Sequence, residues 1–190
     1  MIDYFRRLRE VAAAFPEVIA PVADADLHMT IQSIKSRDTA GERVGADHLR
    51  RAASALRREL TSLEPFDLDI GPTRASGSAA IVEIWPEEGP AALNRRVRRA
   101  LVSAGLDLPP AEDHFWCHMS LGYGITDTDT PELAARSDQL ASALGQRIRP
   151  GIRTWATVSS VWLVWERQHP DLATYTFEPI HEIHLAKDLA

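Results

Sequence analysis

The sequence predicts an α+β protein with two matching lobes, and two observations favour that fold class. The segment "HMTI" at residues 28–31 returns as "HMSL" at residues 118–121, roughly half the chain later. After each segment the expected order of helix and strands is the same, and the next strand starts about 38 residues after the first histidine and about 37 after the second. We therefore expect a duplicated bilobal fold, with two mainly antiparallel sheets, outer helices and a central cleft between pseudo-symmetric lobes.

The first half of the chain is expected to hold two helices and three strands. The first helix has an apolar face at helical spacing and is stopped by Pro16. Asp47 can cap the second helix. The turn-rich "GPTRASGS" joins the second and third strands. The expected bounds are a helix at 3–14, a strand at 27–34, a helix at 47–61, and strands at 66–70 and 79–85.

The second half is expected to repeat this order after one extra helix. Pro90 opens that extra helix and Gly105 ends it. The pair Thr130-Pro131 starts the next helix, and the turn "ERQHPD" separates the last two strands. The expected bounds are a helix at 90–105, a strand at 114–123, a helix at 130–145, and strands at 154–165 and 174–185.

The composition is that of one folded unit. With 190 residues, 45% hydrophobic and 25% charged, the chain can bury one sizeable core. We expect a single bilobal domain over residues 1–190: an N-terminal helical addition (1–20), a first repeat with a connecting helix (21–108) and a second repeat (109–190). The sequence also predicts a cytoplasmic monomer without a membrane segment, because charges interrupt the N-terminus and no apolar run reaches about 20 residues.

Charge and cysteine content narrow the function classes. A net charge of −6 disfavours binding to an extended duplex and favours a nucleotide or a nucleic-acid end. The single cysteine, Cys117, cannot form an internal disulfide, and one thiol is weak support for a metal site.

The repeated segments carry the residue types that phosphoryl chemistry uses. In a strand, alternate side chains share a face, so His28 lies beside Thr30, and His118 lies beside Ser120. If the two strands are neighbours, two imidazoles and two hydroxyls converge on one cleft. One neutral imidazole can accept a proton, a protonated one can donate a proton, and hydroxyls can bind phosphate oxygens. This arrangement requires no metal.

Two such tetrads on strands of a duplicated α+β chain resemble the 2H phosphoesterase superfamily, which includes the LigT-like 2'-5' RNA ligase and cyclic phosphodiesterase group. The resemblance covers about residues 27–185. It implies that His28 and His118 are catalytic and that Thr30 and Ser120 bind phosphate. This chain has Ser rather than Thr in its second motif, a change that the family accepts.

The resemblance implies substrates that are 2',3'-cyclic phosphates, 2'-5' linkages at RNA ends or related nucleotides. The implied activity is a phosphoesterase that needs no cofactor, and a ligase acting in the reverse direction is an alternative. A noncatalytic module that binds nucleotide or RNA in the same cleft is a further alternative.

Aromatic residues near the motifs could stack on a base. Phe115, Trp116 and Tyr123 are the nearest to the second motif, and Trp85 and Trp165 end strands that could border the cleft. Core packing is the simpler expectation for each of them. Tyr123 is the first choice for substrate binding, because Gly122 and Gly124 beside it let the chain turn.

Cationic loop residues are further candidates for substrate binding. Lys35, Arg37 and Arg43 follow the first motif strand in a polar loop that could cover a phosphate, and Arg74 sits in a comparable loop. The arginines of the helices are expected to form solvated faces.

Two histidine groups resemble zinc sets, but the strand geometry disfavours both. Cys117 should face away from His114 and His118, and His181 and His184 should lie on opposite faces of a strand. We therefore expect no metal at these positions. His114 shares a face with His118 and could reach the cleft rim, but solvent exposure at the start of the strand is the simpler expectation.

Overall fold

The structure is a computed structural model, and it describes the chain apart from residues 126–129, 148–152 and 187–190. Four helices and seven strands are assigned within the described residues. They are α1 (Ile2–Ala12), β1 (Ile19–Pro21), α2 (Ala46–Leu60), β2 (Phe66–Ala75), β3 (Ala79–Trp85), α3 (Glu88–Ser103), β4 (His118–Gly124), α4 (Pro131–Arg147), β5 (Thr154–Val158), β6 (Ser160–His169) and β7 (Thr174–His184). The α+β fold class is confirmed.

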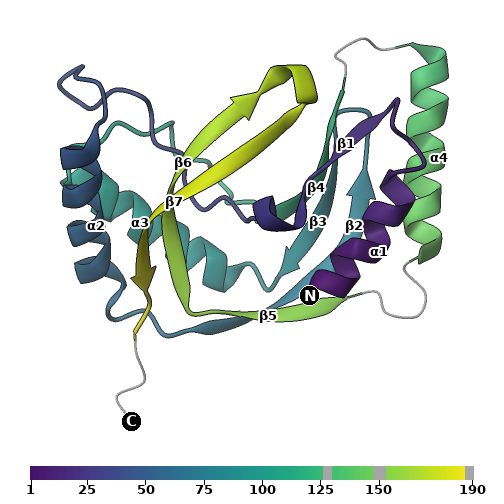
Figure 1. Cartoon of the computed structure of the whole chain (residues 1–190). Coiled ribbons are helices and arrows are strands. Elements are labelled where there is room, and N and C mark those ends of the chain that lie inside the picture. The colour runs from purple at the N-terminus through teal and green to yellow at the C-terminus, as the bar shows by residue number, and fades with distance from the viewer. Residues whose placement is uncertain (126–129, 148–152, 187–190) are drawn as a thin grey trace.

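The larger sheet has five antiparallel strands in the order β1-β4-β3-β2-β5. Its strands bury alternate apolar residues, such as Val82 and Ile84 of β3, beneath α1 and α4. Helix α1 contributes Phe5 and Leu8 to this core, and α4 contributes Leu140. In Figure 1 the two helices lie together on the right, against the sheet.

The smaller sheet is the antiparallel hairpin β6-β7. It packs with α2 and α3, which lie on the opposite side of the molecule from α1 and α4 (Figure 1). The second core is built from Leu56 and Leu60 of α2, Leu93 of α3, Leu163 of β6 and Ile183 of β7. Each core draws on both halves of the sequence, while the predicted division into repeats at 21–108 and 109–190 stays a prediction.

The predicted strand at 154–165 is divided between the two sheets. Strand β5 pairs with β2 as far as Val158, and β6 begins at Ser160 in the hairpin. Ser159 lies between them, and its carbonyl accepts a hydrogen bond from the N–H of Leu185 at 2.9 Å. A run of apolar and hydroxyl residues does not reveal at which residue a strand changes sheets, so the sequence could not locate this break.

The prediction of a strand at 27–34 is wrong. The structure assigns no strand there, and the partners of this segment come from α3 and the loop after it. The Asn94 side chain donates to the Ile31 carbonyl at 2.6 Å, and the N–H of Lys35 donates to the Asp107 carbonyl at 3.1 Å. Such partners replace the backbone ladder of a strand.

Smaller differences lie at element ends. The N-cap of α2 is Gly45, and Asp47 lies in the first turn, where it pairs with Arg50. Helix α3 starts at Glu88, so Pro90 sits within its first turn. Strand β1 had no expected counterpart. Among the described residues, no helix is both long enough and apolar enough to cross a membrane.

Candidate functional site

The second motif occupies the start of β4, which lies between β1 and β3 in the larger sheet. Met119 and Leu121 are buried in the first core, whereas His118 and Ser120 are half-buried. The two pairs therefore lie on opposite faces of the strand, as the sequence predicts. The sheet thus fixes the backbone beneath the imidazole and the hydroxyl.

The first motif keeps the same alternation without a strand ladder. Leu27 and Met29 pack against the first core, and Ile31 packs against the second. His28 is half-buried and Thr30 is exposed. Apolar residues at every second position hold the segment extended across both cores, which gives His28 and Thr30 a common side.

The two motif segments touch. The Sγ atom of Cys117, directly before His118, lies 2.8 Å from the Sδ atom of Met29, directly after His28. Burial, with a smaller contribution from the charge of Glu87, raises the pKa of Cys117 to about 12. The thiol therefore stays neutral in this apolar contact, which brings together segments that are far apart in sequence.

Both motif histidines are held in the same way. Nδ1 of His28 lies 2.7 Å from the Asp26 carbonyl oxygen, and Nδ1 of His118 lies 3.3 Å from the Trp116 carbonyl oxygen. In each case the carbonyl belongs to the residue two positions earlier. Because a carbonyl only accepts, each Nδ1 carries the hydrogen, and each Nε2 is left to act as acceptor or donor.

Each imidazole also packs against an aromatic ring. The ring centroids of His28 and Phe177 of β7 are 4.1 Å apart, and those of His118 and Trp116 are 4.6 Å apart. Core packing was expected for Trp116, but this residue is 42% exposed. Its exposure follows from its position before β4 begins, where the chain has not yet entered the sheet.

Glu83 of β3 is a site residue that sequence reasoning missed. It pairs directly with His118 across the two strands, and only 9% of the residue is exposed. Its Oε1 accepts from Nη1 of Arg74 at 3.0 Å, and its Oε2 accepts from Nε1 of Trp116 at 3.0 Å. A single acidic residue in the apolar run "AAIVEIW" was the available signal, since a buried carboxylate needs such donors.

Tyr123 lies on the same side of β4 as Ser120. Ile81 pairs with Ser120 but Ala80 pairs with Gly122, so β4 has one extra residue at this point. Such a bulge reverses the facing of the residues that follow. Burial raises the pKa of Tyr123, although a hydrogen bond with the Ser120 side chain acts to lower it. The Tyr123 ring also packs edge-on against Tyr175 of β7, with centroids 4.7 Å apart.

The other cationic candidates have local partners. Lys35 pairs with Asp107 at 2.8 Å, and Nη1 of Arg37 donates to the Gly41 carbonyl at 2.8 Å. Arg43 is exposed, and its backbone bridges that of Arg37. The contacts of Arg37 and Arg43 close the loop after the first motif on itself, and the Lys35–Asp107 pair ties this loop to the segment after α3. Arg74 remains the candidate that contacts Glu83 beside His118.

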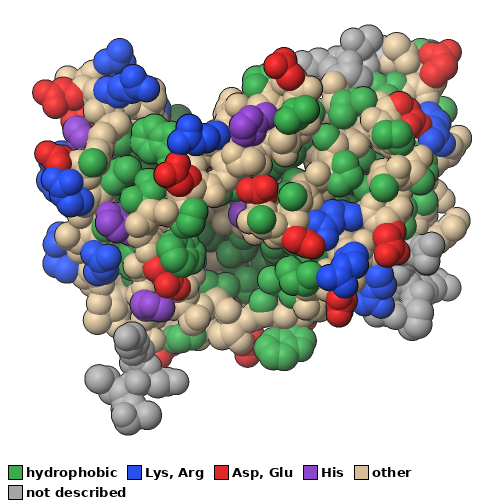
Figure 2. Space-filling view, in the orientation of Figure 1, with side chains coloured by type: hydrophobic (Ala, Val, Ile, Leu, Met, Phe, Trp, Pro, Cys, Tyr) green, Lys and Arg blue, Asp and Glu red, His purple; other side chains and the backbone are tan. Residues whose placement is uncertain are grey.

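A cavity of about 1030 Å³ lies between the first motif segment and β6. Its lining includes His28 and Thr30 on one side and Trp162 and Trp165 on the other. His118 and Ser120 are not among its described lining residues, so this cavity adjoins only the first motif. On the face of the molecule drawn in Figure 2, the surface is hollowed near the middle, with hydrophobic side chains inside the hollow.

Sequence comparison identifies the family. The model of the 2'-5' RNA ligase superfamily matches residues 20–170. The chain belongs to this superfamily. A search of the curated proteins finds no match.

Solved structures show the same fold as this superfamily member. E. coli LigT complexed with 3'-AMP aligns with a TM-score of 0.65 and 15% identity, covering 97% of this chain and 92% of that chain. TT0787 of Thermus thermophilus aligns with a TM-score of 0.65 and 16% identity, covering 99% and 94%. A structure described as a phosphoesterase aligns with a TM-score of 0.62 and 16% identity, covering 95% and 92%. The bilobal architecture expected from the sequence is the one that these proteins have.

The histidines that resembled zinc sets have other partners in this 2'-5' RNA ligase superfamily member. His114 is exposed and its Nε2 lies 3.1 Å from Oε2 of Glu87. His184 is also exposed, and its Nε2 lies 3.8 Å from Oε2 of Glu182. Cys117 points into the first core.

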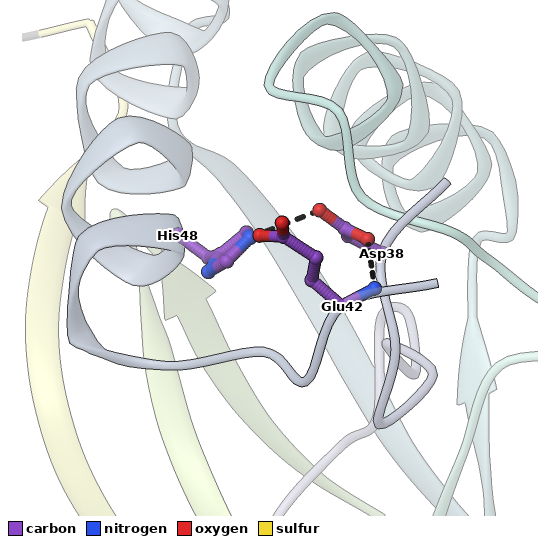
Figure 3. Close-up of side chains that lie close together, drawn as sticks. All are labelled: Asp38, Glu42 and His48. Atoms are coloured by element: carbon purple, nitrogen blue, oxygen red, sulfur yellow. Dashed lines mark hydrogen bonds and ion pairs between the residues drawn. The ribbon is translucent and has the colours of Figure 1, made fainter. Parts of the chain in front are cut away.

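One group among the described residues has ligand atoms close enough to hold a metal: Asp38, Glu42 and His48 (Figure 3). The N–H of Gly45 donates to Nδ1 of His48 at 3.3 Å, so that nitrogen carries a lone pair and Nε2 of the neutral ring carries the hydrogen. This Nε2–H donates to Oδ2 of Asp38 at 3.0 Å. The hydrogen occupies the position a metal would take.

The carboxylate of Asp38 organises the loop that precedes α2. Burial acts to raise its pKa, but the N–H of Glu42, His48 and the N–H of Ala40 together hold the pKa below its usual value. The Asp38 carboxylate therefore already has its hydrogen-bond donors within the loop and α2. The Asp38, Glu42 and His48 cluster fits a structural role in closing the 37–45 loop better than a metal site.

Proposed function

We propose that this protein is a phosphoesterase that opens 2',3'-cyclic phosphates or cleaves 2'-linked phosphodiesters in nucleotides or RNA ends. His28 and His118 act as the acid/base pair, without a metal or other cofactor. The observation that carries the proposal is the matched anchoring of the two imidazoles, each through Nδ1 to the carbonyl two residues earlier. Two histidines prepared in the same way, on segments that touch, suit one reaction that needs a proton acceptor and a proton donor.

The anchoring defines what each ring can do. With Nδ1 protonated in both rings, the neutral form has a lone pair at Nε2 and the charged form has a hydrogen there. In hydrolysis of a cyclic phosphate, water attacks phosphorus while the neutral ring takes a proton from that water. The charged ring gives its Nε2 proton to the departing ribose oxygen, so the P–O bond breaks without releasing an alkoxide.

The hydroxyls complete the proposed site. Thr30 and Ser120 share the sides of their segments with the two histidines and can donate hydrogen bonds to the non-bridging phosphate oxygens. Negative charge on those oxygens is stabilised by donors that are already positioned. Tyr123 supports Ser120 through their hydrogen bond.

Membership of the 2'-5' RNA ligase superfamily supports this reaction class. E. coli LigT, whose fold this chain shares, has been solved in complex with 3'-AMP, with phosphate and with ATP. A protein of this fold therefore accommodates nucleotides and phosphate. The same site can join ends when the reaction runs in reverse, and the substrate supplied decides the direction observed.

Hydrolysis of 2',3'-cyclic mononucleotides, with identification of the product, tests the proposal. We expect His28→Ala and His118→Ala each to lower kcat/KM by about 10²- to 10⁴-fold, the usual contribution of one general acid or base. The double variant should lose much less than the product of the two effects, because the pair works as a unit. His184→Ala is the matched control, since its ring is exposed and outside both motifs.

Two further readouts separate this mechanism from its alternatives. The rate should rise and then fall with pH, because the imidazole that accepts a proton must be neutral and the imidazole that donates one must be charged. Both limbs of this pH–rate profile describe the coupled pair of histidines rather than either histidine alone. EDTA should leave the rate unchanged. Binding of nucleotide without any turnover would instead support the noncatalytic module, and loss of activity in EDTA with recovery in zinc would overturn the metal-free mechanism.

A further inference from the structure

We propose that Trp116 and Arg74 form a subsite for a second nucleotide, the one on the 5' side of the nucleotide that carries the reacting cyclic phosphate. The preferred substrate is then an RNA end at least two nucleotides long, rather than a single nucleotide. This inference rests on the proposed function in one respect: the reacting phosphate lies at His118. The subsite itself is carried by the contacts among Trp116, Arg74 and Glu83.

One buried carboxylate holds the two side chains next to each other. Oε2 of Glu83 accepts the indole N–H of Trp116, and Oε1 accepts Nη1 of Arg74, both at 3.0 Å. The Glu83 side chain is 11% exposed, whereas that of Arg74 is 69% exposed. The acid is therefore covered while the cation that it positions stays accessible to a ligand.

Trp116 offers a stacking surface with a fixed orientation. Its ring packs on the His118 imidazole at 4.6 Å, yet the residue remains 42% exposed. Because Glu83 already accepts the indole N–H, that group is not available to a ligand, and the aromatic face is. A base stacked on such a face contributes sequence-tolerant affinity.

Arg74 offers donors for a second phosphate. Guanidinium has five N–H donors, and the bond from Nη1 to Glu83 leaves the others available for a phosphodiester. Arg74 pairs with Ile81 in β3, and Ile81 pairs with Ser120 in β4. With strands about 4.8 Å apart, the Arg74 backbone lies about 10 Å from that of Ser120, one strand away from the phosphate-binding hydroxyl.

A cation beside an exposed aromatic ring is the combination that single-stranded RNA recognition uses, with phosphate contacts that position and stacking that holds the base. Both the indole ring and the guanidinium stay accessible to such a ligand. A mononucleotide that places its phosphate between the histidines has no second phosphate to offer Arg74.

The first experiment compares two substrates in each variant: a 2',3'-cyclic mononucleotide and a dinucleotide that ends in the same cyclic phosphate. The measured quantity is the ratio of kcat/KM for the dinucleotide to that for the mononucleotide. We expect the wild type to prefer the dinucleotide, and Arg74→Gln to lower the ratio by about 10-fold, as for loss of one charge-assisted hydrogen bond. Arg6→Gln is the matched control, because Arg6 is also exposed and paired with an acid but lies on α1.

A second arm tests the aromatic face. A dinucleotide in which the added nucleotide lacks its base should lose about 10-fold in kcat/KM with the wild type. The same substrate should lose much less with Trp116→Leu, where the stacking surface is already gone. Using substrate ratios removes any change that Trp116→Leu causes at His118 itself.

A binding measurement keeps the subsite testable if turnover is absent. In His28→Ala protein, titration with the cyclic-ended dinucleotide should quench tryptophan fluorescence at lower concentration than titration with the mononucleotide, and Arg74→Gln should remove that difference. If the wild type turned over neither substrate, the proposed function would be overturned. The binding measurement would still decide whether the subsite exists. Equal binding of both ligands, or equal effects of Arg74→Gln and Arg6→Gln, would overturn the subsite.

Discussion

Single residues in this site play two roles at once. Trp116 accepts the Nδ1–H of His118 through its carbonyl and packs against the same imidazole through its ring. The ring is in turn fixed by Glu83. The orientation of one candidate catalytic group thus depends on a residue two positions before it and on a carboxylate in the neighbouring strand.

Cys117 provides a prediction that is independent of any substrate. Burial raises its pKa from an ordinary 9.0 to about 12, so the folded thiol keeps its proton at pH values where an unfolded thiol loses it. Between those values the unfolded state binds fewer protons, and stability falls as the pH rises above 9. From pH 8 to pH 10, the wild type should lose about 1.4 kcal/mol more free energy of unfolding than Cys117→Ala.

Urea denaturation of both proteins at the two pH values measures this difference. Comparison with Cys117→Ala cancels the contributions of the buried tyrosines, which the two proteins share. Parallel loss of stability in wild type and variant would show that the thiol ionises as readily in the fold as in the unfolded chain. Slow reaction of the native thiol with maleimide, and fast reaction in urea, should accompany the expected result.

At the scale of elements, periodicity predicted most of the fold and the faces of both motifs. The apolar stripes of the helices and the alternation around His118 can be read from short stretches of sequence. Side chains share a face at every third to fourth residue in a helix and at every second residue in a strand. The missing ladder at 27–34 is not local: Asn94, which donates to the Ile31 carbonyl, lies 63 residues further along the chain. Periodicity shows which side of a segment is buried, but it does not show which other segment supplies the hydrogen-bond partners.

The same reasoning explains which residues of the candidate site could be predicted from the sequence. The repeated tetrads predicted His28, Thr30, His118 and Ser120 as a set, because both halves carry the same pattern. Glu83 escaped notice, because its importance comes from facing His118 across β3 and β4. The side of Tyr123 depends on a one-residue bulge, which alternation alone cannot locate.

The two motifs should differ in backbone protection. Within the described part of the chain, no backbone N–H from residues 28–34 donates a hydrogen bond to another backbone carbonyl. Strand β4, in contrast, pairs with β3 over residues 118–123 and with β1 over residues 122–124. In hydrogen–deuterium exchange, peptides covering 28–34 should exchange far faster than those covering 118–123. Asn94→Ala, which removes the donor to the Ile31 carbonyl, should lower the free energy of unfolding measured in urea by about 1 kcal/mol. Equal protection of the two motifs would mean that the first is a paired strand in solution.

At the scale of the whole molecule, the two cores are joined rather than merely adjacent. Phe66 of β2 and Val158 of β5 pack against both. The first motif segment does the same, with Met29 on one core and Ile31 on the other. Disturbing one core therefore removes contacts from the other, and the lobes should unfold together.

Urea denaturation should give the same single transition whether it is monitored by far-ultraviolet circular dichroism or by tryptophan fluorescence. Phe66→Ala should keep that coincidence and lower the free energy of unfolding by about 3 kcal/mol, the low end for such a change, because Phe66 is only half-buried. Leu172→Ala is the control, since Leu172 is 67% exposed and should cost less than about 0.5 kcal/mol. Two separated transitions would show lobes that fold independently.

The carbonyl that anchors each motif histidine lies only two residues before it, and this has an evolutionary consequence. An imidazole oriented by a distant side chain needs two matching changes when a segment is copied within a gene. Here the orienting group is a backbone atom of the motif segment itself, so a copy of that segment would carry a prealigned histidine whatever the surrounding sequence became. The residues that surround each histidine are then free to differ, as Phe177 beside His28 and Trp116 with Glu83 beside His118 illustrate.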